Sequence, residues 1–278
     1  MRIFKHNSNR QFPSYQNTEI WMINDAFDMF VNRGDGILSK LILIILSFFH
    51  PKDNRKSIAI YLQELIGLMY PKYKKNYASR YKKNVINALK NESNFVIEIK
   101  GKKKRLFTSI FLYKDGLLLI NCDYKFINRI LYIEDRPLDE KNGFFKIDVN
   151  KLNKFNTINK YIPIWLYILQ LTNNGMSLSG FTIWKTTLFP KLGIYTKINF
   201  IEFNYKVFKP AMKYIVEIDK DKECKVDEIE ARTKGDNQLI KLSVKVPEIK
   251  EEKSKEEKQE TDKKEAPECF KKFYKAIK

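Results

Sequence analysis

The stretch from Tyr195 to Val246 limits the choice of fold more than any other part of the chain. Its first half carries apolar residues at steps of four and three, the spacing that places side chains on one face of a helix. These residues are Ile201, Tyr205, Phe208, Met212 and Ile215. Its second half alternates apolar and polar residues from Ile240 to Val246, which is typical of a half-buried strand. We therefore predict a long amphipathic helix, packed on one face, followed by a β-hairpin.

The residues on either side of this helix complete a recognisable unit. Asn159 to Thr172 is apolar and aromatic and predicts a first helix, and Phe181 to Leu188 predicts a short second helix. Pro190 to Gly193 then supply the turn before the long helix. Pro210 lies inside that helix, where it removes one hydrogen bond and predicts a kink or a break. Cys224 to Glu230 supply the first hairpin strand, before turn residues around Gly235.

The charge of the chain indicates a polyanionic partner. The formal net charge is +19 in 278 residues. The tail from Lys250 to Glu265 holds six Lys against seven acidic residues, so the basic excess lies in the part with folding potential. An AT-rich genome would also enrich Lys, Asn and Ile, and a scaffold protein with compositional charge therefore stays open as an alternative.

The amino-terminal half predicts a similar unit. Ile20 to His50 reads as two helices broken near Gly34, followed by a strand at Ile58 to Ile60 and a helix at Tyr61 to Met69. Lys74 to Asn91 is the next helix. Its predicted buried stripe is Tyr77, Tyr81, Val85 and Ala88. The opposite side is polar and basic, as a helix that enters the major groove requires, although a solvated helix face has the same pattern.

A cationic hairpin follows this helix. Phe95 to Ile99 and Leu106 to Tyr113 predict strands, and the segment from Lys100 to Arg105 joins them as a basic tip. Exposed hairpins also carry Lys for solubility. After a basic amphipathic helix, however, such a tip is typical of a wing that lies along phosphates. The expected DNA contacts of both halves are Asn76, Ser79, Arg80, Lys82, Lys83, Lys102, Lys103, Lys104, Arg105, Tyr195, Thr196, Lys197, Asn199, Asn204, Lys206, Lys209, Arg232 and Lys234.

Several kinds of catalysis lack their residues. His6 and His50 are the only histidines and stand apart, so the metal-assisted strand nicking of rolling-circle initiators has no ligand cluster. No phosphate-binding loop of the G-x-x-x-x-G-K-[ST] type occurs. We expect no enzyme activity, no cofactor and no bound metal.

Three scattered cysteines indicate a reducing, cytoplasmic setting. The apolar run from Ile37 to Phe49 is too short for a bilayer, so we expect no membrane association.

The long helix resembles the carboxy-terminal winged helix of the initiator replication proteins of theta-replicating plasmids. The family has a basic K/R-V-x-x-P-A element in mid-helix, which here reads Lys206-Val207-Phe208-Lys209-Pro210-Ala211, and Glu217 falls where the family has Glu. The run Leu166-Tyr167-Ile168-Leu169 is similar to the family's L-Y-x-L-L core. The resemblance runs over roughly residues 20 to 246.

The resemblance implies binding to repeated origin sites in double-stranded DNA, opening of adjacent AT-rich DNA and recruitment of the host replication helicase machinery. It also implies a homodimer through the amino-terminal domain, for which the helix at Ile37 to Phe49 is the candidate. A winged-helix transcriptional regulator stays open as an alternative, and a nuclease or primase is a more distant one.

The fold class predicted from these observations is α+β, with two tandem winged-helix domains, each a helix-turn-helix plus a β-hairpin wing. The expected boundaries are a flexible arm at 1–19, the first domain at 20–135, a linker at 136–150, the second domain at 151–247 and a disordered charged tail at 248–278. Cys269 to Ile277 is amphipathic enough for a short terminal helix.

Overall fold

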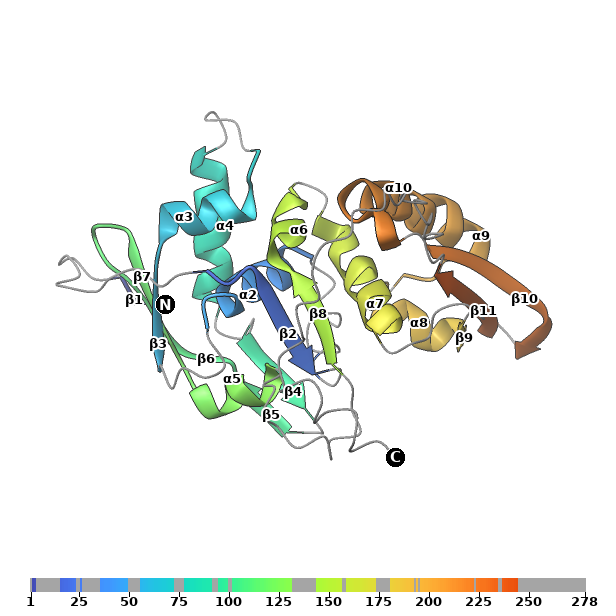
Figure 1. Ribbon diagram of the computed structural model, residues 1–278, viewed down its shortest axis with the longest axis horizontal. Helices are drawn as coiled ribbons and strands as arrows, with labels where there is room; N and C mark the ends of the chain where they lie inside the picture. Colours follow the sequence, from blue (N-terminus) through green and yellow to red (C-terminus); the bar gives the residue numbers. More distant parts are fainter. Residues whose placement is uncertain are drawn as a thin grey trace, which may run out of the picture. The chain divides into compact units, whose positions relative to one another are not determined.

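The structure is a computed structural model of the whole chain, shown in Figure 1, and Met1–Val246 form one compact unit. It describes residues 2–3, 16–23, 26, 36–49, 56–72, 78–91, 95–99, 102–131, 144–156, 159–173, 181–192, 194, 196–222, 224–234 and 237–244. The predicted tail and its terminal helix lie outside these residues.

The amino-terminal half is built on a four-stranded sheet of order β1-β6-β7-β3. β6 (Phe107–Leu112) and β7 (Leu117–Cys122) form a hairpin, and β3 (Ser57–Tyr61) pairs with β7. The β6–β7 turn needs Gly116, whose φ of 86° is costly for any other residue. β1 (Arg2–Ile3) runs parallel to β6. The flexible arm predicted for 1–19 is therefore wrong for Arg2 and Ile3, because they extend this sheet.

A second pairing joins residues that lie far apart in the sequence. β2 (Glu19–Ile23) pairs with β8 (Phe144–Asp148), and Figure 1 shows the two strands side by side. The prediction of a helix from Ile20 is thus wrong at its start, because these residues pair with β8 and burial alternates from Glu19 to Met22. The linker predicted for 136–150 is also wrong from residue 144 onward, since Phe145 and Ile147 are fully buried.

The helices of this half are α2 (Gly36–Leu46), α3 (Leu62–Met69), α4 (Ala78–Lys90), α5 (Tyr124–Ile130) and α6 (Val149–Lys154). The first three follow the predicted order, whereas α5 and α6 are not among the predicted helices. α2 is buried on nearly all sides, which fits its sequence, since Ser39 and Lys40 are its only polar residues. This burial overturns its expected role as a dimer contact, since its apolar side chains are already packed in the chain's own core.

One buried lysine joins three of these helices. Lys40 of α2 is fully buried, and its Nζ donates hydrogen bonds to the backbone oxygens of Met69, Asn153 and Phe155. Met69 ends α3, and Phe155 is the C-cap of α6. The Lys40 Nζ therefore lies at two helix C-termini, where carbonyl oxygens without helical partners carry partial negative charge and accept hydrogen bonds.

The carboxy-terminal half begins with η4 (Asn159–Tyr161) and α7 (Ile162–Asn173), as predicted. β9 (Phe181–Trp184) and α8 (Lys185–Lys191) follow. The predicted helix from Phe181 is wrong for its first turn, because these residues pair with β11. Pro190 lies inside α8 and not in the turn after it.

The predicted long helix and hairpin are both present. α9 (Phe200–Glu202), the π-helix η5 (Phe203–Phe208) and α10 (Lys209–Ile218) form one continuous run, followed by η6 (Lys220–Lys222). β10 (Cys224–Lys234) and β11 (Asn237–Val244) form the hairpin, with β9 as third strand in the order β10-β11-β9 (Figure 1). Helices followed by a hairpin occur in both halves, which confirms the α+β winged-helix prediction.

Candidate nucleic-acid interface

The polar face of α4 is exposed along its length. Val85 and Leu89 are buried, and the Tyr81 ring stacks on Tyr70 with centroids 4.2 Å apart. Leu89, and not Ala88, therefore completes the buried stripe. The predicted contact residues on the opposite side are all exposed: Ser79, Arg80, Lys82 and Lys83. Asn76 lies outside the described residues, as does Tyr77 of the predicted buried stripe.

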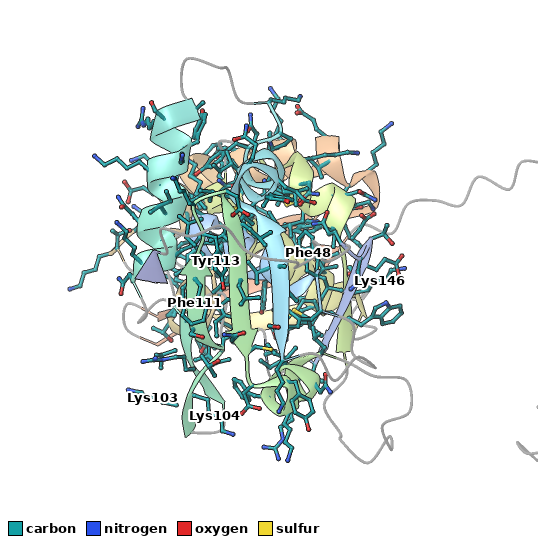
Figure 2. The ribbon with its side chains drawn as sticks, turned by 90° about the vertical axis from the view of Figure 1, so that its left-hand side faces the viewer. Phe48, Lys103, Lys104, Phe111, Tyr113 and Lys146 are labelled. Atoms are coloured by element: carbon teal, nitrogen blue, oxygen red, sulfur yellow. The ribbon has the colours of Figure 1, made fainter. Side chains whose placement is uncertain are left out.

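The basic segment between the predicted wing strands is itself a strand. β5 (Lys102–Arg105) pairs with β4 (Val96–Ile99), so the prediction of a basic loop is wrong for these four residues. Backbone pairing explains this, because each of these four residues lies opposite a residue of β4. The predicted order of a basic helix followed by a cationic hairpin is retained. Figure 2 shows Lys103 and Lys104 on this ribbon.

The strand geometry divides the basic side chains between two faces. Lys104 lies opposite Ile97, which is buried, and its Nζ lies 5.3 Å from the centre of the Phe126 ring in α5. Lys103 and Arg105 alternate with it and share the open face with Val96. Lys102 belongs to the strand, but its side chain is not described. The open face of the ribbon is therefore carried by Lys103 and Arg105.

In its first part, the long helix buries other residues than those of the predicted buried stripe. Phe208, Met212 and Ile215 are buried as expected, but Ile201 is 65% and Tyr205 63% exposed. A π-helix spans Phe203–Phe208, in which the N–H of Lys209 donates to the oxygen of Asn204, five residues back. Counting back from Phe208 by five residues and then three gives Phe203 and Phe200, and these are the buried side chains.

The extra residue of the π-turn thus rotates the start of the helix relative to its end. Pro210 follows this turn directly, and the helical run continues through it. Of the predicted kink or break, the break is therefore wrong. The missing N–H of Pro210 falls where the α-helical bonding pattern is already interrupted. Aromatic packing holds the rotated segment, since the Phe203 ring centre lies 4.8 Å from that of Phe189 and 5.7 Å from that of Phe208.

The exposed side of this segment is a mixed basic and apolar surface. Asn199 is the N-cap: its Oδ1 accepts from the N–H of Glu202 at 2.8 Å. The Glu202 carboxylate accepts from Lys206 at 2.8 Å, and this bond lowers the pKa of Glu202. Lys209 lies over the Tyr205 ring, 4.0 Å from its centre. We call Ile201, Glu202, Tyr205, Lys206 and Lys209 the outer helix face.

The other predicted residues of this half fall into three groups. Thr196 and Lys197 are exposed but precede the helix, which begins at Phe200. Asn204 is half-buried. Arg232 and Lys234 lie in β10, but their side chains are not described, and Tyr195 is outside the described residues. The structure therefore brings Lys206 and Lys209 together on the outer helix face. Sequence periodicity placed Ile201 and Tyr205 on the buried face of the helix and not on its exposed face, because a π-turn has no clear signal in one sequence.

A buried polar cluster holds the end of the long helix. Asp219, the C-cap of α10, is 2% exposed and accepts from Lys151 at 2.7 Å and from the indole N–H of Trp165 at 3.2 Å. Lys151 belongs to α6 and Trp165 to α7. A carboxylate at this depth needs such partners, since desolvation of an unpaired charge is costly.

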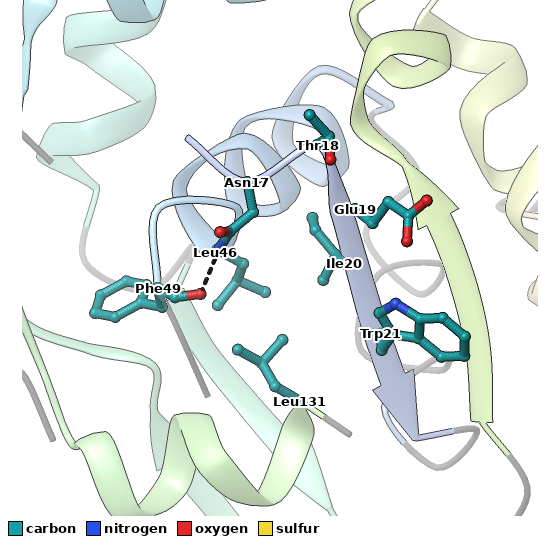
Figure 3. Close-up of a pocket in the computed structure, with 8 residues that line it drawn as sticks. All are labelled: Asn17, Thr18, Glu19, Ile20, Trp21, Leu46, Phe49 and Leu131. Carbon is teal, nitrogen blue, oxygen red and sulfur yellow. Dashed lines mark hydrogen bonds between the residues drawn. The ribbon is translucent and has the colours of Figure 1, made fainter. Parts of the chain in front are cut away.

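A half-open pocket of about 220 Å³ lies between the end of α2 and β2 (Figure 3). Leu46, Phe49, Trp21 and Leu131 contribute to its lining, and the Asn17 side-chain amide donates to the Phe49 oxygen at 2.9 Å. Among the described residues that line it, none is basic, which distinguishes it from the cationic surfaces. In the part of the chain that the structure describes, no cluster of three His, Cys, Asp or Glu could hold a metal ion. No helix among those residues has the length and apolar character to cross a membrane.

Comparisons with known proteins give the fold but no close relative. No protein-family model matches the chain, and no curated protein sequence does. The chain is similar to the Pi initiator protein, solved as a crystal structure in complex with iteron DNA, with a TM-score of 0.59 and 16% identity over 83% of this chain and 99% of that one. Two crystal structures of domains 2 and 3 of RctB match with TM-scores of 0.39 and 0.37, at 10% and 12% identity. They cover 86% and 87% of this chain and 94% and 95% of theirs.

The likeness to the Pi initiator protein extends over nearly its whole solved chain, so both halves share its fold. The predicted resemblance to initiator replication proteins is thereby confirmed at the level of the fold.

Proposed function

We propose that the protein is a plasmid replication initiator that binds repeated origin sites in double-stranded DNA. The observation that supports this most is the fold match to a protein crystallised on iteron DNA, which includes both halves of the chain. The exposed basic residues of α4, of β5 and of the outer helix face agree with it, because phosphate contacts need unburied Lys and Arg.

The proposed mechanism uses both halves on one duplex. α4 and the start of the long helix each enter a major groove, while the basic ribbon β4–β5 lies along phosphates. Binding to several repeats then promotes opening of adjacent AT-rich DNA and recruits the host helicase machinery. The function is one of binding without catalysis, in the cytoplasm. We include a homodimer through the amino-terminal half, on a surface other than α2.

The test measures sequence-selective DNA binding and then the opening of an adjacent duplex. Duplexes are selected by the protein from a random pool, and affinity for the best duplex is compared with a shuffled one at fixed salt. A specific binder should prefer the selected duplex by about a thousandfold or more. Direct repeats of it are then placed beside an AT-rich segment in a supercoiled plasmid. Permanganate, which oxidises unpaired thymines, should modify that segment only when protein is bound.

Each alternative predicts a different result. Equal affinity for selected and shuffled DNA would indicate a scaffold with compositional charge. Selective binding without permanganate reactivity would indicate a transcriptional regulator, and magnesium-dependent cleavage of the plasmid would indicate a nuclease. Lys83→Ala with Lys103→Ala tests the amino-terminal surface. Lys114→Ala with Lys125→Ala removes the same charge from exposed positions outside it, and should change affinity much less.

A further inference from the structure

Two large apolar side chains on the outer helix face are largely exposed to solvent. Ile201 and Tyr205 are the most exposed of the large hydrophobic residues in the described part of the chain, at 65% and 63%. They are four residues apart, which places them on the same side of the helix. Leaving so much apolar surface in water is unfavourable, so a contiguous pair of this kind marks a contact surface.

Their exposure is imposed by the packing beneath them. Phe200 and Phe203 occupy the core side of the same segment, and the π-turn supplies the rotation that puts them there. Turning Ile201 inward would force the fully buried Phe203 into water, at the loss of its contacts with Phe189 and Phe208. π-turns inside α-helices are frequent at functional sites, where they re-aim side chains.

The surroundings of the pair identify the partner that covers it. Lys206 and Lys209 belong to the same face, and exposed Lys197 precedes it. An apolar protein groove has no need of this cationic border, whereas duplex DNA presents phosphates on both sides of its major groove. The apolar group on the floor of that groove is the C5-methyl group of thymine.

We propose that Ile201 and Tyr205 contact thymine methyl groups, so that the carboxy-terminal half selects sites with thymine at defined positions. This rests on the proposed function, because it names the base that the same surface reads. Lys209, held over the Tyr205 ring, fixes the ring on one side and extends toward the phosphates. Ile201 lies in the first turn of the helix, the part that reaches base edges in helix-turn-helix complexes.

The experiment removes one methyl group at a time. The best duplex selected by the wild-type protein is resynthesised with uracil in place of each thymine, which deletes the methyl group and leaves base pairing intact. Binding should weaken about fourfold for each contacted methyl, at one or a few positions. The Ile201→Ala and Tyr205→Ala proteins should bind the thymine duplex more weakly and should no longer distinguish uracil from thymine at those positions.

Tyr61→Ala is the matched control, since Tyr61 is exposed on β3, away from the outer helix face, and should keep the wild-type uracil profile. Ile201→Val should keep part of the discrimination, and thermal unfolding checks that each variant is folded. Uracil profiles that are flat for the wild-type protein, or unchanged in the two alanine variants, would overturn the inference while the initiator proposal stands. A wild-type protein that does not prefer selected over shuffled DNA would overturn the initiator proposal itself.

Discussion

Replacing Lys40 with Met tests whether the buried amino group of Lys40 controls the stability of the fold. Lys40 is fully buried, and Asn153 and Met69 accept from its Nζ at 3.3 and 2.8 Å, together with Phe155. Burial lowers the pKa of Lys40 from 10.5 to about 7. Methionine keeps the length and apolar character of the side chain but donates no hydrogen bond.

The sign of the pH dependence is set by this pKa. Between about pH 7 and pH 10.5 the folded chain has lost the proton at Lys40 that the unfolded chain still binds, so the free energy of unfolding rises with pH. The slope is about 1.4 kcal/mol per pH unit for one proton. The Met variant lacks this contribution. It also leaves carbonyl oxygens at two helix ends without a donor, at about 1–3 kcal/mol each.

We therefore expect Lys40→Met to be the less stable protein at pH 9, with a gap that narrows by about 2 kcal/mol as pH falls to 7.5. Urea unfolding followed by tryptophan fluorescence at three pH values measures this gap. Lys125→Met, at an exposed position of α5, is the control and should show no pH-dependent difference from the wild type. A gap of constant size would refute the reasoning, because Lys40 would then titrate equally in the folded and unfolded chains.

Two further predictions concern the long helix. Asp219→Ala should lower the free energy of unfolding by about 2–4 kcal/mol, since it leaves the buried Trp165 N–H and the partly exposed Lys151 without their acceptor. Asp219→Asn keeps an acceptor and should cost less in the same urea titration; equal losses would mean that the acceptor is unimportant. Glu202→Gln should release Lys206 toward phosphates and steepen the salt dependence of DNA binding by about one unit, whereas Lys197→Ala with Lys206→Ala should flatten it. Unchanged slopes in both would count against the long helix as the DNA-binding element.

The elements that sequence predicts well are those whose signal is local. α4, α7 and the β10–β11 hairpin follow from helical periodicity, strand alternation and turn residues within a few positions. β2 and β9 lie in segments that the sequence predicts as helix. Each is a strand only because it pairs with a distant partner, about 125 residues away for β2 and about 60 for β9. Short apolar segments of this kind carry no period strong enough to identify the distant partner.

The sequence predicts which elements carry the basic residues of the candidate site, but it does not always predict which of their side chains face the solvent. The exposed basic residues of α4 follow from the helical period, because that helix is regular. The outer helix face does not, since one inserted residue at the π-turn rotates the residues before it by about 100° relative to those after it. Ile201 and Tyr205 therefore appear as core residues in the sequence and as surface in the structure. Similarly, strand alternation in β5 separates Lys104 from Lys103 and Arg105, which a loop would not do.

The short helix α6 connects the two halves through directional polar bonds. At its C-terminal end, the oxygens of Asn153 and Phe155 accept from Lys40 of α2. One turn earlier, Lys151 donates to Asp219 at the end of α10, which also accepts from Trp165. Apolar packing alone tolerates small rotations, whereas hydrogen bonds at buried positions lose most of their strength when misaligned. Because α6 is bonded to α2 on one side and α10 on the other, the long helix is held in a defined orientation relative to the amino-terminal core. The proposed binding of two surfaces in successive grooves of one duplex needs this restraint, since an error in that orientation would remove one surface from its groove.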